Sequence, residues 1–174
     1  MDLITKLENK VLRWARSLPH LPASNRKWLG INIWWLVLIV AIFSGLGLLT
    51  SLYGLLVGAT VNGNSDIAYL TGGYSSLVMM SAVISIVFIA ANLLLLALAI
   101  KPLKAMEKKG WVLVFMALLV QVLAVVVDAV LSFNILTFIL SLIYGAMVTA
   151  ISLYFLFEIH GEFAHKPKAK IKKL

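Results

Sequence analysis

The sequence predicts an all-α membrane protein, in which a four-transmembrane-helix bundle follows an N-terminal amphipathic interfacial helix. Three observations predict this fold class. Hydrophobic residues make up 62% of the 174 residues and charged residues only 13%, with a mean hydropathy of +1.02, whereas soluble domains are about half apolar and a quarter charged. Long apolar runs reach the roughly 20 residues that cross a bilayer core. All 15 Lys and Arg residues fall on one side of the predicted spans.

The first expected element is a cationic amphipathic helix in residues 1–22, which Pro19 and Pro22 separate from the first span. Such a helix beside a membrane is expected to lie in the interface, with Trp14 at the level of the lipid headgroups. Docking against a partner protein is the alternative. The helix places Leu3, Leu7, Val11 and Leu18 along one face and Lys6, Lys10, Arg13 and Arg16 around the other.

The bundle is expected over residues 23–158. Its spans are predicted at about 29–58, 76–100, 111–131 and 135–157. Ser24 and Asn25 are candidate caps for the first helix. The first apolar run is longer than the bilayer core, so we expect it to tilt, project or bend at Gly45 and Gly47. It is also too long for the apolar part of a signal peptide, so we expect it to be retained.

The positions of the basic residues predict the direction of the spans. Lys and Arg precede the first span, separate the second from the third and follow the fourth, whereas the segments "ATVNGNSDIAYLTGGYSS" and "SFN" contain neither. Asp66 is the one charge in those two segments. Because basic residues near span ends stay in the cytoplasm, both termini are expected there, in a chain of the cytoplasmic (inner) membrane.

Polar side chains within the spans are candidates for packing or for lining a pathway. Asn92 and Gln121 lie near mid-depth on consecutive antiparallel helices, so we expect a hydrogen bond between them. Trp111 is expected as an interfacial anchor, which places Asp128 about 26 Å further along its helix, near the outer surface. Asp128 is then either a solvated end residue or an ion or proton site facing the bundle.

Small residues recur at helical spacing in the spans and predict close helix packing, either within the bundle or between copies of the chain. The second span adds Ser81 and Ser85 to the face of Asn92, and Ser152 continues the stripe of the fourth. The main stripes are Gly47, Ser51, Gly54 and Gly58 in the first span and Ser141, Gly145 and Thr149 in the fourth.

The cytoplasmic surface is expected to contact anionic lipid headgroups, and residues 159–174 form a basic tail. Without aromatic interleaving or a folded module, nucleic-acid binding is not expected. Glu158, His160 and Glu162 are close in sequence, but His160 faces away from the two acids, so no metal site is predicted. The expected lipid contacts are Lys6, Lys10, Arg13, Arg16, Lys108 and Lys109.

The sequence gives little support for an enzymatic function. The chain has no Cys, which excludes disulfides, thiolate nucleophiles, iron–sulfur clusters and cysteine zinc sites. No nucleophile-elbow, zincin, Walker or dinucleotide-binding pattern is present, so no catalytic or cofactor-binding residue is predicted.

Two junction sequences, "KPLKAMEKKGW" before the third span and "LYFLFEIHGEF" at the end of the fourth, resemble those of small four-span bacterial inner-membrane proteins of uncharacterised function. Phe163 occupies a position where those proteins often carry an aromatic residue. The resemblance implies a fold and an inner-membrane location, and it transfers no activity and no site residue.

The expected function is that of a non-enzymatic scaffold or accessory subunit of a membrane complex, with a protein partner or a second copy of the chain bound through helix faces. The alternative is a small transporter or channel subunit that acts as an oligomer, with Asn92, Gln121 and Asp128 as its polar lining. A membrane-embedded enzyme ranks third.

Overall fold

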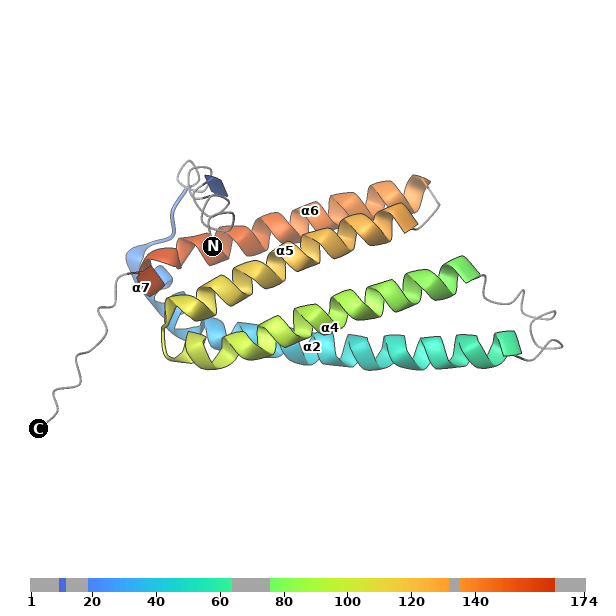
Figure 1. The fold of residues 1–174 in the computed structure, drawn as a ribbon. Helices are drawn as coiled ribbons and strands as arrows, with labels where there is room; N and C mark the ends of the chain where they lie inside the picture. The colour runs from blue at the N-terminus through green and yellow to red at the C-terminus, as the bar shows by residue number, and fades with distance from the viewer. Residues whose placement is uncertain (1–9, 12–18, 64–75, 132–134, 165–174) are drawn as a thin grey trace, which may run out of the picture.

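The structure is a computed structural model that describes residues 10–11, 19–63, 76–131 and 135–164. The described residues are 94% helical and contain no strand. Four long helices, α2 (Ala23–Gly63), α4 (Ser76–Lys104), α5 (Lys108–Leu131) and α6 (Ile135–Glu158), are followed by the short α7 (His160–Ala164) (Figure 1). All four long helices have the length and apolarity needed to cross a membrane. The helices predicted at 76–100, 111–131 and 135–157 are therefore confirmed to within a few residues.

Helix α2 is longer than its predicted span. Its 41 residues correspond to about 62 Å, roughly twice the thickness of a bilayer core. The carbonyl of Pro22 accepts hydrogen bonds from the amides of Asn25 and Arg26 at 3.0 and 3.1 Å. Ser24 is thus already inside the helix, and the prediction that Ser24 or Asn25 caps it is wrong. The helix runs without interruption through Gly45 and Gly47, so these glycines do not break it.

The long helices pack in chain order: α2 on α4, α4 on α5 and α5 on α6. Within the described residues, no extended interface joins α2 to α6. The bundle is therefore open between its first and last long helices. In Figure 1 the α2–α4 pair and the α5–α6 pair are closest at the end that carries α7, and they separate toward the other end.

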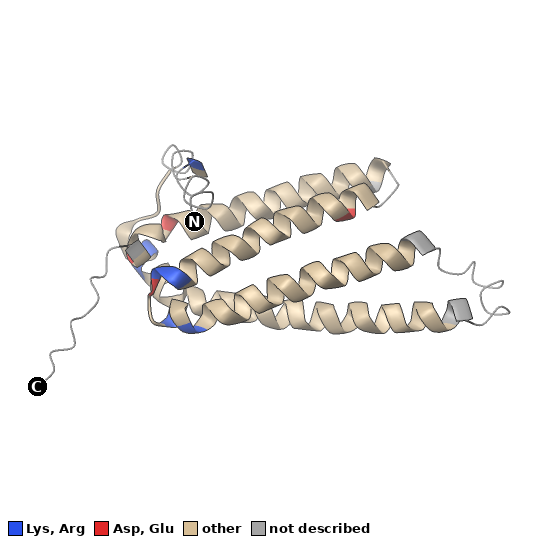
Figure 2. Cartoon of the chain, in the orientation of Figure 1, with Lys and Arg blue, Asp and Glu red and all other residues tan. Residues whose placement is uncertain are grey.

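The tightly packed core lies at one end of the bundle, here called the basic end. Its described basic residues are Arg26, Lys27, Lys101, Lys104, Lys108 and Lys109 (Figure 2). Trp111 is fully buried there, stacked on Phe115 at 5.5 Å between ring centroids and edge-on to Phe157 at 5.2 Å. Its Nε1 donates to the carbonyl of Leu156 at 2.8 Å. The prediction that Trp111 is an interfacial anchor is wrong, because its indole is enclosed by the helices and satisfied by the α6 backbone.

Two glycines lie where a neighbouring helix leaves no room for a Cβ. A Cβ on Gly110 would lie 2.5 Å from the backbone nitrogen of Leu103, so only glycine fits at the start of α5. A Cβ on Gly145 would collide with Val125, which confirms that Gly145 packs within the bundle. Its neighbours in the predicted stripe, Ser141 and Thr149, are half-buried.

The stripe on α2 behaves differently. A Cβ on Gly47 or Gly54 would meet no described atom within 4 Å, so the prediction of packing within the bundle is wrong for these two glycines. Ser51 is half-buried and Gly58 is buried. The difference arises because, among the described residues, α2 forms an extended interface with only one other long helix, α4.

Candidate polar site between the helix pairs

Asn92 links α4 to α5 at mid-helix. Its Nδ2 donates to the carbonyl of Ala117 at 3.0 Å and to Oε1 of Gln121 at 3.3 Å. The predicted hydrogen bond between Asn92 and Gln121 is therefore present. Asn92 is 9% exposed, whereas Gln121 is exposed. The carbonyl of Ala117 can only accept, so it sets the orientation of the Asn92 amide and leaves Oδ1 directed elsewhere.

A second polar contact joins the same two helices nearer the opposite end. The hydroxyl of Ser85 donates to Oδ1 of Asp128 at 2.7 Å. Asp128 is exposed and lies three residues before the last residue of α5. Ser85 was placed by the sequence only in a packing stripe, although its seven-residue spacing from Asn92 matches that of Asp128 from Gln121. That shared spacing is the sequence signal from which the Ser85–Asp128 contact could have been predicted.

A central cavity of about 520 Å³ lies between the four long helices and has Asn92 and Gln121 in its lining. Ser44 of α2 and Ser152 of α6 add two hydroxyls, and the remaining lining side chains are Leu, Ile, Val, Ala and Phe. A second cavity of about 400 Å³, here called the α2–α4 pocket, shares Ser44, Asn92 and Gln121 with it. The polar pair therefore lies where the two cavities meet, and Asp128 lines neither.

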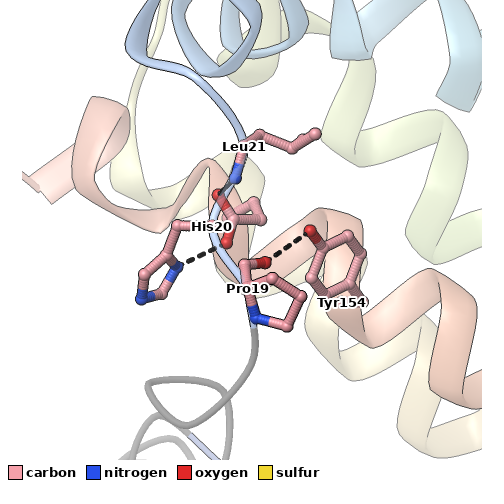
Figure 3. A network of polar contacts seen from close by, with 5 residues as sticks. Pro19, His20, Leu21 and Tyr154 are labelled. Atoms are coloured by element: carbon pink, nitrogen blue, oxygen red, sulfur yellow. Dashed lines mark hydrogen bonds and ion pairs between the residues drawn. The ribbon is translucent and has the colours of Figure 1, made fainter.

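Residues 19–21, which precede α2, are hydrogen-bonded to the end of α6 (Figure 3). The Glu158 side chain is 4% exposed and accepts hydrogen bonds from Nδ1 of His20 at 2.6 Å and from the amide of Leu21 at 3.2 Å. One turn earlier, the hydroxyl of Tyr154 donates to the carbonyl of Pro19 at 2.8 Å. We call these contacts the α6 clasp. The sequence does not predict the α6 clasp, because its partners are more than 130 residues apart and share no local pattern.

The other predicted site residues lie at the surface or outside the described residues. Lys10, Lys108 and Lys109 are exposed. Lys10 and Val11 line a groove of about 630 Å³ formed mainly by α5 and α6. Most of the predicted amphipathic helix lies outside the described residues, as do Lys6, Arg13 and Arg16 and residues 165–174 of the predicted basic tail. The prediction that the tail begins at residue 159 is wrong, because residues 160–164 form α7 and both Ile159 and Phe163 are buried in the core.

Chemical groups that would hold a metal do not gather in the described part of the chain. No group of three or more His, Asp or Glu side chains is placed to bind a metal ion there. Glu158 faces His20, whereas the ring of His160 packs edge-on against Trp111 at 4.8 Å. The described residues around the Asn92–Gln121 pair thus provide hydrogen-bonding groups and apolar surface.

The chain matches no protein-family model, no curated protein and no solved structure. Its resemblance to small four-span bacterial membrane proteins therefore stays a prediction from the two junction sequences.

Proposed function

We propose that this chain is a multi-pass protein of the cytoplasmic (inner) membrane that acts as a non-enzymatic scaffold or accessory subunit of a membrane complex. Insertion is supported by the apolar side chains left uncovered along the helices. Phe43, Leu49 and Leu56 of α2 are 69%, 65% and 64% exposed. Contiguous apolar surface of this kind is unfavourable in water but is the ordinary surface of a helix in lipid.

The proposed direction places the basic end in the cytoplasm, with both termini on that side. Lys and Arg are retained there, and Trp side chains favour the interface. Trp28 and Trp35 of α2 are 65% and 51% exposed near the basic end and replace Trp111 as the expected interfacial anchors. Lys104 lies over the ring of Trp34, 5.0 Å from its centroid, beside this aromatic group.

One contrast among the glycines carries the scaffold proposal. Neighbouring helices occupy the space that a Cβ would need at Gly110 and Gly145, whereas a Cβ on Gly54 would meet no described atom within 4 Å. Gly54 is exposed and lies two helical turns beyond Gly47, which lines the α2–α4 pocket. Small residues let another helix approach closely in a membrane. We therefore assign this face of α2 to a transmembrane helix of a partner protein.

The orientation is tested first, independently of any partner. A reporter fused after Leu174 is expected to be active only in the cytoplasm. In this cysteine-free chain, a Ser65→Cys variant is expected to react with a membrane-impermeant thiol reagent added outside the cell. Activity of the reporter outside the membrane would reverse the proposed direction.

The scaffold role is tested by purification from membranes in mild detergent, followed by identification of the proteins that remain attached. Gly54→Phe is expected to remove a stoichiometric partner, because the ring fills the space that the partner helix would occupy. Leu49→Phe adds a ring on another face of α2 and serves as the matched control. Loss of the partner in both variants, or in neither, would refute the assignment of this face.

Transport is the second candidate function, and the cavity beside Asn92 and Gln121 favours it. In this case flux in proteoliposomes is expected to depend on Asp128, the one carboxylate of α5. An Asp128→Asn variant that retains full flux would remove this residue from the mechanism.

A further inference from the structure

The central cavity has the properties of a ligand site. Pockets for small molecules usually enclose about 300–1,000 Å³, have apolar walls and carry a few polar groups that orient the ligand. The cavity of about 520 Å³ matches this size and composition. Its walls come from all four long helices, and it reaches the side on which α2 and α6 form no extended interface.

The Asn92 amide has an unused acceptor at this cavity. Both hydrogens of Nδ2 are accounted for by Ala117 and Gln121, while Oδ1 accepts no hydrogen bond from a described residue. Among described residues, no fully enclosed side-chain nitrogen or oxygen lacks a partner. Oδ1 therefore keeps some accessible surface, although the side chain as a whole is only 9% exposed, and Asn92 lines both the central cavity and the α2–α4 pocket.

Gln121 supplies the complementary group. Its Oε1 is engaged by Asn92, whereas its Nε2 donates to no described residue. An acceptor on α4 and a donor on α5 thus border the same space. A ligand that satisfies both must donate one hydrogen bond and accept another.

The depth of this pair argues against a charged ligand group. Asn92 lies nine residues before Lys101, the nearest basic residue of the basic end on α4, which corresponds to about 14 Å along the helix. The cations of the basic end are therefore too far away to compensate a charge beside Asn92, and an uncompensated charge in an apolar cavity is costly. A phospholipid headgroup is excluded for the same reason.

We propose that the central cavity binds a neutral single-chain amphiphile, whose terminal hydroxyl contacts Asn92 and Gln121 while its alkyl chain lies between α2 and α6. The hydroxyl donates to Oδ1 of Asn92 and accepts from Nε2 of Gln121. The proposal rests on membrane insertion but not on the scaffold role.

Binding is tested with full-length protein purified in detergent, using radiolabelled 1-hexadecanol as the probe. Saturable binding of one molecule per chain is expected. Hexadecyl methyl ether, which accepts but cannot donate, is expected to bind about tenfold more weakly, the effect of losing about one hydrogen bond in a desolvated site. Hexadecane, which does neither, is expected to bind more weakly still. Equal affinities for the three probes, or no saturable binding of hexadecanol, would overturn the proposal.

Variants locate the binding site. Gln121→Leu keeps much of the side-chain volume and is expected to weaken hexadecanol binding about fivefold to tenfold without changing hexadecane binding. Val148→Phe places a ring in the cavity and is expected to abolish binding of both, whereas Ile143→Phe adds the same ring to the 61%-exposed outer face of α6 and leaves binding intact. Equal binding by these two α6 variants would overturn the proposal even if Gln121→Leu failed to fold. Failed binding leaves the orientation and partner experiments unaffected.

Discussion

Ser85 and Asp128 join α4 to α5 through a hydrogen bond of 2.7 Å, one heptad from the Asn92–Gln121 contact on both helices. Because residues seven apart share a helical face, the two contacts lie on the same antiparallel interface. Toward the basic end, α4 and α5 come close together at Leu103 and Gly110, where a Cβ on Gly110 would lie 2.5 Å from the Leu103 backbone nitrogen. These two polar contacts thus join α4 to α5 in the part of the interface that lies beyond the tightly packed core.

Ser85 and Asp128 are expected to be energetically coupled. In a double-mutant cycle of Ser85→Ala and Asp128→Ala, measured by denaturant unfolding in detergent, we expect a coupling free energy of about 1 kcal/mol, typical of one hydrogen bond. Ser81→Ala provides the control, because the Ser81 hydroxyl donates to Val78 of its own helix. Its cycle with Asp128→Ala is expected to be additive within about 0.5 kcal/mol. Additive effects for Ser85 would contradict the contact.

Asn92 is expected to matter more to stability than Gln121. Asn92→Leu removes the donor to both Ala117 and Gln121 and is expected to lower the free energy of unfolding by about 1–2 kcal/mol, within the range of interhelical hydrogen bonds in membranes. Gln121→Leu leaves the contact with Ala117 intact, so a loss below about 1 kcal/mol is expected. The same detergent unfolding assay measures both variants. Equal losses would show that the Ala117 contact contributes nothing.

The helices were predictable because local sequence determines where most of them end. The runs at 76–100 and 135–157 end at charged or turn-forming sequence, and α4 and α6 end within a few residues of those points. Helix α2 exceeded its prediction because no helix-breaking residue separates Ala23 from the apolar run, so its polar first turns continue the helix.

The candidate site was predictable in part. The Asn92–Gln121 bond follows from matching depths on consecutive helices, which sequence spacing reveals. The burial of Trp111 and the contact between Glu158 and His20 do not follow from spacing, because both depend on which faces of distant elements meet. The same limit applies to Gly54 and Gly145: their sequence surroundings are alike, and only the positions of the helices show which glycine is covered.

Glycines in the two environments are expected to respond oppositely to alanine. Gly110→Ala places a methyl group 2.5 Å from the backbone of Leu103 and is expected to lower the free energy of unfolding by about 1–3 kcal/mol, as overpacking does. Gly54→Ala has open space and is expected to be neutral or to add up to about 1 kcal/mol through helix propensity. Thermal unfolding of the purified chain without a partner measures both. A neutral Gly110→Ala would contradict the close approach of α4 and α5.

The α6 clasp is expected to protect the segment before α2 from hydrogen exchange. Between Pro19 and Pro22 only His20 and Leu21 carry a backbone N–H, so a peptide covering this segment reports on them directly. Glu158→Ala removes the acceptor of the Leu21 amide and of the His20 ring. We expect exchange in this segment to become about tenfold faster, because an amide without its partner opens to solvent. Glu162→Ala removes a neighbouring acid of α7 and is the matched control, for which unchanged exchange is expected. Tyr154→Phe, which loses the bond to Pro19, is expected to have a smaller effect in the same direction, because Glu158 still holds Leu21. Equal exchange in the wild type and Glu158→Ala would mean that Glu158 does not hold this segment in solution.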